Sequence, residues 1–203
     1  MKLYCKSGAC SLSPHIALLE SGLPFTVETV DLATKVTETG KDFKAINPKG
    51  YVPALELDDG SLLTEGSAIV LYIASKAAPG LLAPAMGTSD YFHVLEWLTF
   101  IGTELHKGCG PFFNPAMTAE GLAPLKARLQ LRLDTANAML GKGPYVMGNH
   151  FTVADGYLFT VLGWLPAVGL DLAAWPNLAR FRQTVAARPK VQEALKAEGL
   201  AAA

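Results

Sequence analysis

The apolar residues of this chain change their spacing once, across a segment at residues 78–88 that concentrates proline, glycine and alanine. Before this segment, short apolar and β-branched runs alternate with helical stretches. After it, apolar residues recur at helical spacing only. A change of this kind is typical of a domain boundary. We therefore expect an α/β domain over residues 1–78, a linker over residues 79–88 and an all-α domain over residues 89–203.

The first domain is predicted to have the element order β-α-β, a variable stretch, and then β-β-α. Residues 3–5 are an apolar, strand-like run, a helix follows Cys10, and residues 25–32 are rich in β-branched residues. Residues 52–64 predict two short strands, because they are joined through an Asp-Asp-Gly hairpin signal. The segment 64–77 predicts a helix.

Composition excludes several classes of protein. The chain has 203 residues, of which 50% are hydrophobic, and its formal net charge is −1, so neither nucleic acid nor an anionic membrane is an expected partner. Its 3 cysteines have no metal-type spacing, so we expect no disulfide framework, no metal and a reducing compartment. No signal peptide and no apolar run of roughly 18 residues is present, which predicts a cytoplasmic protein without a membrane partner.

Cys10 lies between the first predicted strand and the first predicted helix. Ser11 and Ser13 are candidate N-caps of that helix, and Pro14 suits its first turn. Backbone N–H groups and the positive end of the helix dipole favour a thiolate over a thiol at this place. We therefore expect a reactive Cys10 with a lowered pKa, with an inert cysteine as the alternative. Cys5, inside the strand, is expected to be a small buried hydrophobe.

Two further motifs predict a binding site for a peptide-like ligand. A cis Val52-Pro53 bond would leave the Val52 N–H and C=O free to pair with an extended peptide, and an ordinary edge-strand proline is the alternative. At the start of the next helix, backbone N–H groups of Glu65-Gly66-Ser67 can hold a carboxylate. Glu65 can accept from an ammonium group and Ser67 can donate, although a plain helix cap is the alternative.

The second domain carries a polar stripe and a capping motif. On the helix predicted over residues 89–108, the stripe should face a cleft or a partner, and it consists of Glu96, Thr99, Thr103 and His106. Thr152 and Asp155 predict a capping box at the start of a later helix. Residue 156 is glycine, so Phe151 lacks the usual hydrophobic partner there.

Five stretches in order resemble the glutathione transferases, most closely the bacterial beta class, along essentially the whole chain. They are GACSLSPHIALLESG, KDFKAINPKGYVPALELDDG, LTEGSAIVLYIA, EWLTFIGTELHKG and FTVADGYLF. The resemblance implies a thioredoxin-like N-terminal domain, an all-α C-terminal domain and a homodimer with sites near the subunit boundary. It also implies glutathione as the co-substrate, with no metal.

The resemblance implies roles for individual residues. Cys10 would lie beside the glutathione sulfur and form a mixed disulfide with it, Val52 would pair with the peptide before a cis Pro53, and Glu65 would hold the γ-glutamyl end. The predicted catalytic residues are Cys10, His106 and Ser11, and the predicted glutathione-binding residues are Lys35, Val52, Pro53, Glu65, Gly66, Ser67, Thr99, Glu104 and Lys107.

Two positions depart from the family pattern. Many glutathione transferases have serine after the acidic residue, whereas this chain has Gly66, so only a backbone N–H would serve there. Beta-class relatives often have asparagine at the position of Thr99, where a neighbouring subunit contacts the ligand. This chain has the shorter Thr99 there, and Glu104 is the other side chain that the resemblance implies for this contact.

The favoured function is conjugation of the glutathione thiolate to hydrophobic electrophiles, with thiol–disulfide exchange through Cys10. His106 would donate to a sulfur or accept a proton near neutral pH, and Ser11 is a competing hydroxyl donor. A non-catalytic binding protein of the same fold and a glutaredoxin-like reductase using the CxxS of Cys10 and Ser13 are the alternatives. The side chains expected at the electrophile pocket are Phe112, Phe113, Trp164 and Leu165.

Overall fold

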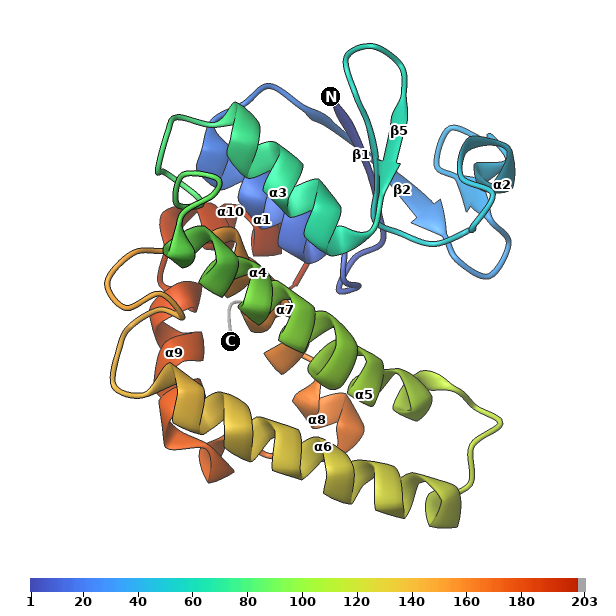
Figure 1. Cartoon of the computed structure of the whole chain (residues 1–203). Coiled ribbons are helices and arrows are strands. Elements are labelled where there is room, and N and C mark those ends of the chain that lie inside the picture. The colour runs from blue at the N-terminus through green and yellow to red at the C-terminus, as the bar shows by residue number, and fades with distance from the viewer. Residues whose placement is uncertain (201–203) are drawn as a thin grey trace.

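Five strands of the N-terminal half form one mixed sheet in the order β3-β2-β1-β4-β5 (Figure 1). The computed structural model describes residues 1–200. The elements of this half are β1 (Lys2–Cys5), α1 (Leu12–Ser21), β2 (Thr26–Asp31), β3 (Val36–Thr37), α2 (Phe43–Ile46), β4 (Ala54–Glu56), β5 (Leu62–Thr64) and α3 (Gly66–Lys76). The predicted order β-α-β and then β-β-α is confirmed, and β3 and α2 fill the stretch that the sequence left variable.

Strand β1 is the centre of the sheet, and Leu3, Tyr4 and Cys5 are buried on one or the other of its two faces. Leu3 and Cys5 point into the large core beneath α1 and α3, as expected for Cys5. Tyr4 points to the opposite face, where its ring lies 5.6 Å from that of Phe43 in α2. Alternating side chains of one strand therefore enter two different cores. Strands β1 and β2 are parallel, because α1 carries the chain back across the sheet between them.

All helices and strands named within residues 89–200 are helices, as predicted, and two isolated β-bridges lie in the loop at residues 145–150. The helical elements are α4 (Ser89–Phe100), the π-helical segment η1 (Ile101–His106), α5 (Lys107–Cys109), the 3-10 turn η2 (Gly110–Phe113), α6 (Ala119–Leu140), α7 (Val153–Leu162), α8 (Leu165–Val168), the 3-10 turn η3 (Leu172–Ala174), α9 (Pro176–Ala186) and α10 (Pro189–Ala197). The helix predicted over residues 89–108 thus changes to π geometry in its last third. Within residues 1–200, no helix has both the length and the apolar character of a bilayer span.

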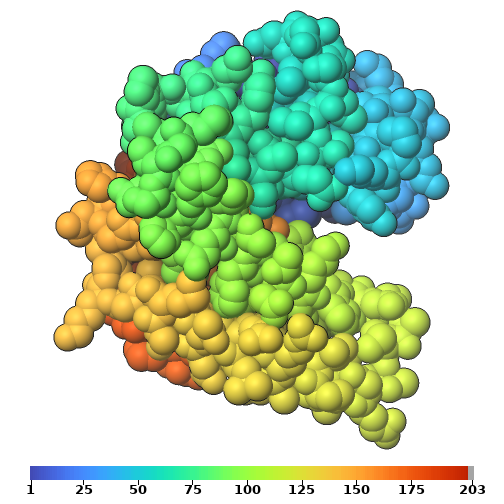
Figure 2. Space-filling model, in the orientation of Figure 1, coloured from blue at the N-terminus to red at the C-terminus, as the bar shows by residue number. Residues whose placement is uncertain are grey.

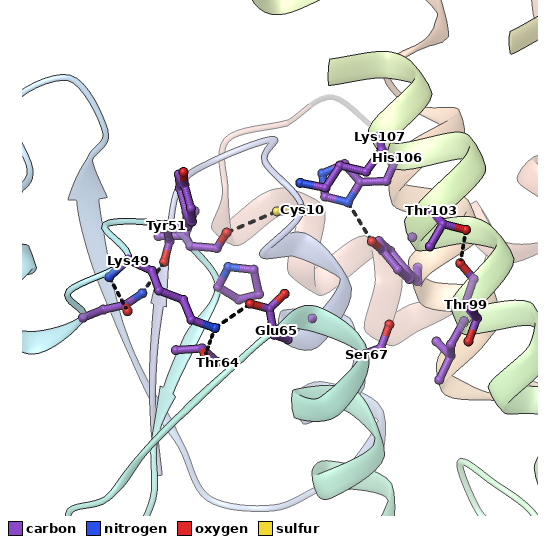
Figure 3. Close-up of a pocket in the computed structure, with 17 residues that line it drawn as sticks. Cys10, Lys49, Tyr51, Thr64, Glu65, Ser67, Thr99, Thr103, His106 and Lys107 are labelled. Atoms are coloured by element: carbon purple, nitrogen blue, oxygen red, sulfur yellow. Dashed lines mark hydrogen bonds and ion pairs between the residues drawn. The ribbon is translucent and has the colours of Figure 1, made fainter. Parts of the chain in front are cut away.

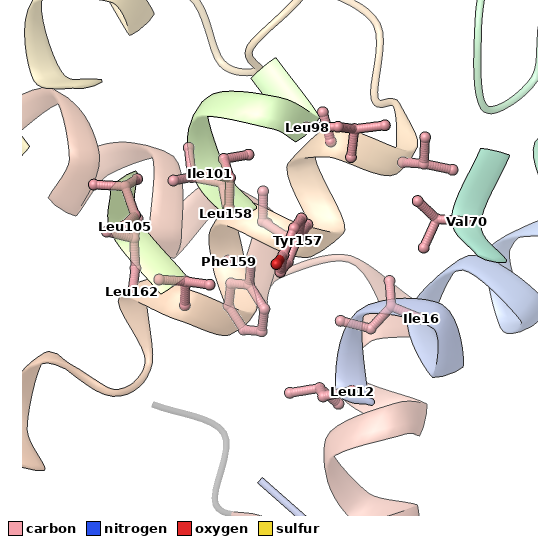
Figure 4. Close-up of a cluster of buried hydrophobic side chains, with 14 of the residues drawn as sticks. Leu12, Ile16, Val70, Leu98, Ile101, Leu105, Tyr157, Leu158, Phe159 and Leu162 are labelled. Atoms are coloured by element: carbon pink, nitrogen blue, oxygen red, sulfur yellow. The ribbon is translucent and has the colours of Figure 1, made fainter. Parts of the chain in front are cut away.

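The two halves share one core. Leu12 and Ile16 of α1 meet Val70 of α3 and the apolar side chains of α4, η1 and α7 (Figure 4). Gly156 of α7 faces α1 at this junction, and a Cβ atom placed there would lie 3.5 Å from Ile16, in ordinary van der Waals contact. Leu82, inside the predicted linker, is buried, and its carbonyl accepts a 2.9 Å hydrogen bond from the N–H of Val153. The linker is therefore fastened to the start of α7.

The predicted capping box of Thr152 and Asp155 is present at the start of α7. The buried Asp155 carboxylate accepts from the N–H of Thr152 at 2.7 Å and from its hydroxyl at 2.9 Å. It also accepts from the N–H of Val146 at 2.7 Å, so one side chain fastens the preceding loop as well as the helix. Phe151, which lacks a partner at Gly156, packs instead against the guanidinium of Arg188 at 4.1 Å.

Candidate active site

A cavity of about 540 Å³ opens where the N-terminal sheet domain meets helix α4 and segment η1. Figure 2 shows the surface hollowed between the blue-to-cyan N-terminal half and the green helices. The cavity brings together all but three of the predicted site residues, and those present are Cys10, Val52, Pro53, Glu65, Gly66, Ser67, Thr99, His106 and Lys107 (Figure 3).

Cys10 lies in the loop between β1 and α1, partly exposed to the cavity. Its thiol donates to the carbonyl of Val52, with Sγ and O 3.3 Å apart. Burial raises the pKa of Cys10 to about 11, although the N–H groups of Cys10 and Ser11 and the charge of Lys107 act in the opposite direction. The expectation of a lowered pKa was therefore wrong for the protein alone. The helix start does favour the thiolate, but desolvation outweighs it.

Val52 and Pro53 form one wall of the cavity, and the peptide bond between them is cis, as predicted. The loop before them is held by Asn47, whose amide donates to the carbonyl of Tyr51 at 2.8 Å. Asn47 and Tyr51 both line the cavity, and the sequence reasoning missed them. The loop therefore presents the backbone of Val52 in a defined position beside the Cys10 thiol.

Glu65 immediately precedes α3 and has a φ of 71°, a conformation that non-glycine residues adopt at an energetic cost. Its carboxylate is 72% exposed at the cavity, where the ammonium of Lys49 lies 2.6 Å away. Lys49 also donates to the hydroxyl of Thr64 at 3.0 Å. Lys49 was not among the site residues predicted from the sequence. Its position three residues before Val52 could have indicated a cation near this site.

His106 enters the cavity from the opposite domain, at the end of η1. Its Nδ1 lies 2.6 Å from the hydroxyl oxygen of Tyr157, another cavity residue that the sequence reasoning missed. Burial and the neighbouring Lys107 lower the pKa of His106 to about 4. The ring is therefore neutral at pH 7. Of the two roles expected for His106, acceptance of a proton near neutral pH does not fit this lowered pKa, and donation to a sulfur stays a prediction. The edge of the His106 ring packs against Trp164, with ring centroids 4.9 Å apart.

Comparison with known proteins decides the family. The model for the N-terminal domain of glutathione S-transferases matches residues 8–76, and the model for their C-terminal domain matches residues 100–189. The chain is also 50% identical over 201 residues to glutathione S-transferase GstA of Escherichia coli O157:H7, with 98% of this chain and 100% of the relative covered. The chain belongs to the glutathione S-transferase family.

Solved structures place this glutathione transferase close to the bacterial beta class. A sphingomonad glutathione S-transferase complexed with glutathione is 47% identical, with a TM-score of 0.94 and coverage of 99% of this chain and 100% of the other. The beta-class enzyme of Sphingomonas chungbukensis is 45% identical, with the same TM-score and coverage. The thioredoxin-like domain with an all-α domain, predicted from the sequence, is thus the fold of this family.

The structure of the transferase does not bring Ser11, Lys35 or Glu104 into the cavity. The buried Ser11 hydroxyl accepts from the N–H of Lys6 at 3.0 Å and donates to its carbonyl at 3.1 Å, so it neither caps α1 nor faces Cys10. The ammonium of Lys35 donates to the carbonyl of Gly50 at 3.0 Å. Both side chains shape the loops around the site.

Glu104 and Thr99 occupy different sides of the same helical stretch. The Glu104 carboxylate lies 2.6 Å from Arg132 and 3.6 Å from Arg128, both on α6 and outside the cavity. Thr99 lines the cavity, but its hydroxyl donates to the carbonyl of Leu95 at 2.8 Å. Of the predicted polar stripe, Glu96 does not line the cavity of the transferase, whereas Thr103 does.

None of the four side chains predicted for the electrophile pocket, Phe112, Phe113, Trp164 and Leu165, lines the cavity itself. Trp164 contacts His106, and the exposed Phe113 lies 6.0 Å from Trp164 between ring centroids. Phe112 is partly buried against the core. Leu165 is completely buried, so it cannot form a wall of the pocket.

Two side chains of the C-terminal half hold the loop that carries Cys10. The Glu198 carboxylate accepts from the N–H of Gly8 at 2.9 Å, and Trp164 donates to the carbonyl of Gly8 at 2.9 Å. The other carboxylate oxygen of Glu198 lies 2.9 Å from Nδ1 of the buried His15. No local motif indicates these contacts, because they join residues that are more than 150 positions apart.

Proposed function

We propose that the cavity of this transferase binds glutathione with its γ-glutamyl end at the start of α3. The Glu65 carboxylate is placed to accept from the ligand ammonium, and it already pairs with the ammonium of Lys49. The N–H groups of Gly66 and Ser67 suit the adjacent carboxylate, because they begin a helix of 11 residues. Gly66 contributes only a backbone N–H, so Ser67 supplies the hydroxyl on this side.

The backbone of Val52 supports the second part of the proposal, in which the cysteinyl residue of glutathione adds to it as a short extended strand. Such a peptide directs its sulfur toward Cys10, whose thiol already contacts Val52. His106 and Lys107 reach toward the same place from the helical half (Figure 3). The convergence of Cys10, Val52 and Glu65 in one cavity is the observation that carries the proposed function.

We further infer that the glutathione thiolate attacks hydrophobic electrophiles. Leu98 and Tyr157 line the cavity beside His106, and the rings of Trp164 and Phe113 continue this apolar surface. The ammonium of Lys107 supplies a positive charge near the sulfur, as its effect on the pKa of Cys10 indicates. The proposal involves no metal, and residues 1–200 contain no cluster of three or more side chains suited to hold one.

Cys10 is proposed to exchange with oxidised glutathione. The thiolate of Cys10 attacks one sulfur of the disulfide, the S–S bond breaks, and reduced glutathione leaves with the proton that Cys10 lost. The protein then carries one mixed disulfide. Cys5 and Cys109 are buried, so Cys10 is the accessible partner among the three free cysteines.

The assembly proposed is a homodimer in the cytoplasm, where thiols remain reduced. Phe92 of α4 and Leu131 of α6 are 58% and 64% exposed, and large apolar side chains of this kind suit an interface with a second copy. Light scattering behind size exclusion measures the mass directly. A monomer at the concentrations used for catalysis would contradict the dimer.

Calorimetric titration with glutathione tests the proposed site. Glu65→Gln removes the carboxylate charge and keeps the side-chain shape, so affinity should fall about tenfold to a hundredfold, the range for a charge-assisted hydrogen bond. Glu56→Gln, a carboxylate of β4 outside the cavity, is the matched control and should bind like the wild type. An unchanged dissociation constant in Glu65→Gln would overturn the assignment.

A further inference from the structure

A hydrogen bond between His106 and Tyr157 connects segment η1 to helix α7 at the cavity. His106 ends η1, Tyr157 lies on α7, and Nδ1 of the ring is 2.6 Å from the phenol oxygen. Tyr157 is only 6% exposed, and the Trp164 ring packs against His106 from another side. The imidazole is therefore packed in one orientation, with Nδ1 toward Tyr157 and with Nε2, on the other side of Cε1, left for another partner.

The protonation of the two groups decides which of them donates. Burial and Lys107 lower the pKa of His106, so the ring is neutral at pH 7 and carries one N–H. Burial and the nearby Cys10 and Glu65 raise the pKa of Tyr157, so the phenol keeps its proton. A phenol O–H is a stronger donor than a neutral imidazole N–H, and an imidazole nitrogen is a stronger acceptor than a phenol oxygen. The shared proton therefore lies on Tyr157.

We propose that Tyr157 is a positioning residue whose hydroxyl donates to Nδ1 and holds His106 as the Nε2–H tautomer, which makes His106 a hydrogen-bond donor to the glutathione sulfur. The inference rests on the proposed function, which brings that sulfur between Cys10 and His106. Nε2 already carries a proton and the Nδ1 lone pair is occupied, so His106 cannot remove the thiol proton. That proton passes to solvent, and the Nε2–H stabilises the thiolate that remains.

Other ionisable groups surround the sulfur position, and each affects the thiolate. Cys10 approaches from the loop before α1, Glu65 from the start of α3 and Lys107 from α5. Lys107 favours the thiolate by its charge, whereas Glu65 opposes it. A variant changed only at Tyr157 keeps the charges of Lys107 and Glu65. Its effect on the thiolate therefore reports the change of the His106 tautomer alone.

Nitrogen NMR of the protein labelled with ¹⁵N-histidine reads the tautomer directly, without glutathione. The chain has 4 histidines, and the spectrum of His106→Gln identifies the signals of His106. At pH 7 we expect a protonated Nε2 and an unprotonated Nδ1. A protonated Nδ1 would overturn the inference and leave the proposed binding site untouched.

Tyr157→Phe keeps the buried ring and removes the hydroxyl. We expect a mixture of both His106 tautomers, a fall in kcat of about threefold to tenfold, and little change in the KM for glutathione. The apparent pKa of the bound glutathione thiol, followed by the ultraviolet absorbance of the thiolate, should rise. Tyr91→Phe on α4, outside the cavity, is the control and should behave like the wild type. A His106 that stays entirely Nε2–H in Tyr157→Phe contradicts the role of Tyr157.

Two variants of His106 distinguish a role as hydrogen-bond donor from a role as general base. Glutamine offers an N–H donor but no basic nitrogen, so His106→Gln should retain more activity than His106→Ala. Equal losses in the two variants, with the Nε2–H tautomer established, would overturn the donor role. Failure of the wild type to bind glutathione in calorimetry would instead overturn the proposed function on which that role depends.

Discussion

The carboxylate of Glu198 accepts a hydrogen bond from the backbone N–H of Gly8, with the two atoms 2.9 Å apart. Glu198 follows the last helix of the chain, whereas Gly8 lies in the loop that carries Cys10. Through this contact and the buried pair with His15, the end of the helical domain holds the start of the sheet domain. The position of the Cys10 thiol therefore depends on both halves of the chain.

Glu198→Ala should destabilise the protein, because it leaves the Gly8 N–H and the buried His15 ring without their hydrogen-bond partner, at about 1–3 kcal/mol for each buried polar group left unpaired. Chemical denaturation at fixed protein concentration measures this difference. Glu193→Ala on α10 is the matched control, since its carboxylate forms only an exposed pair with Lys190 and should change stability by less than about 0.5 kcal/mol. Equal stability of the two variants would contradict the proposed anchoring role.

Alkylation of Cys10 in the protein alone should accelerate steadily as the pH rises above neutrality. Its pKa is raised to about 11, so the reactive thiolate increases about tenfold for each pH unit below that value. The rate with iodoacetamide, followed by mass spectrometry, tests this. Lys107→Met should react more slowly, because the charge of Lys107 favours the thiolate. A plateau near neutral pH would show that the helix start outweighs burial after all.

Asp155→Ala should weaken the helical half and the loop before it. The backbone N–H groups of Val146 and Thr152 lose their acceptor, at about 1–3 kcal/mol for each buried donor left unpaired. Asp171→Ala is the comparison, because Asp171 also accepts from a backbone N–H but is exposed. Thermal unfolding should show a clearly larger loss for Asp155→Ala. Similar losses of stability in the two variants would mean that the buried Asp155 carboxylate stabilises the fold no more than the exposed Asp171 does.

Features of the fold that are set by residues close together in the chain could be predicted from the sequence. The hairpin before α3, the cis Val52-Pro53 bond and the capping box of Asp155 follow from residues close in the chain, and the structure has them. The hydroxyl of Ser11 and the ammonium of Lys35 were misplaced, because Ser11 bonds to the backbone of Lys6 in its own loop and Lys35 bonds to the carbonyl of Gly50 in another loop. Such choices depend on how the loops pack.

The site residues contributed by distant elements could not be found from local patterns. Tyr157 belongs to a motif that the sequence identified only as the start of a helix, and its hydroxyl reaches His106 across the packing of α7 against η1. The pKa of Cys10 was misjudged for a related reason. The helix start is visible in the sequence, whereas the burial that overrides it comes from the folded chain.

The rate of mixed-disulfide formation tests whether this transferase binds glutathione with its sulfur beside Cys10. Oxidised glutathione and a small disulfide without the γ-glutamyl group, 2-hydroxyethyl disulfide, are compared in the wild type and in Glu65→Gln. Peptide mapping by mass spectrometry locates the adduct in each case. The small disulfide reports the intrinsic reactivity and access of Cys10, which Glu65→Gln should leave nearly unchanged.

We expect the wild type to react with oxidised glutathione at Cys10 alone, in a saturable reaction that is faster than the reaction with the small disulfide. S-methylglutathione should block it, and Glu65→Gln should lose most of the preference. Equal rates with the two disulfides in the wild type, or an adduct at Cys109 with Cys10 unmodified, would contradict a glutathione site beside Cys10.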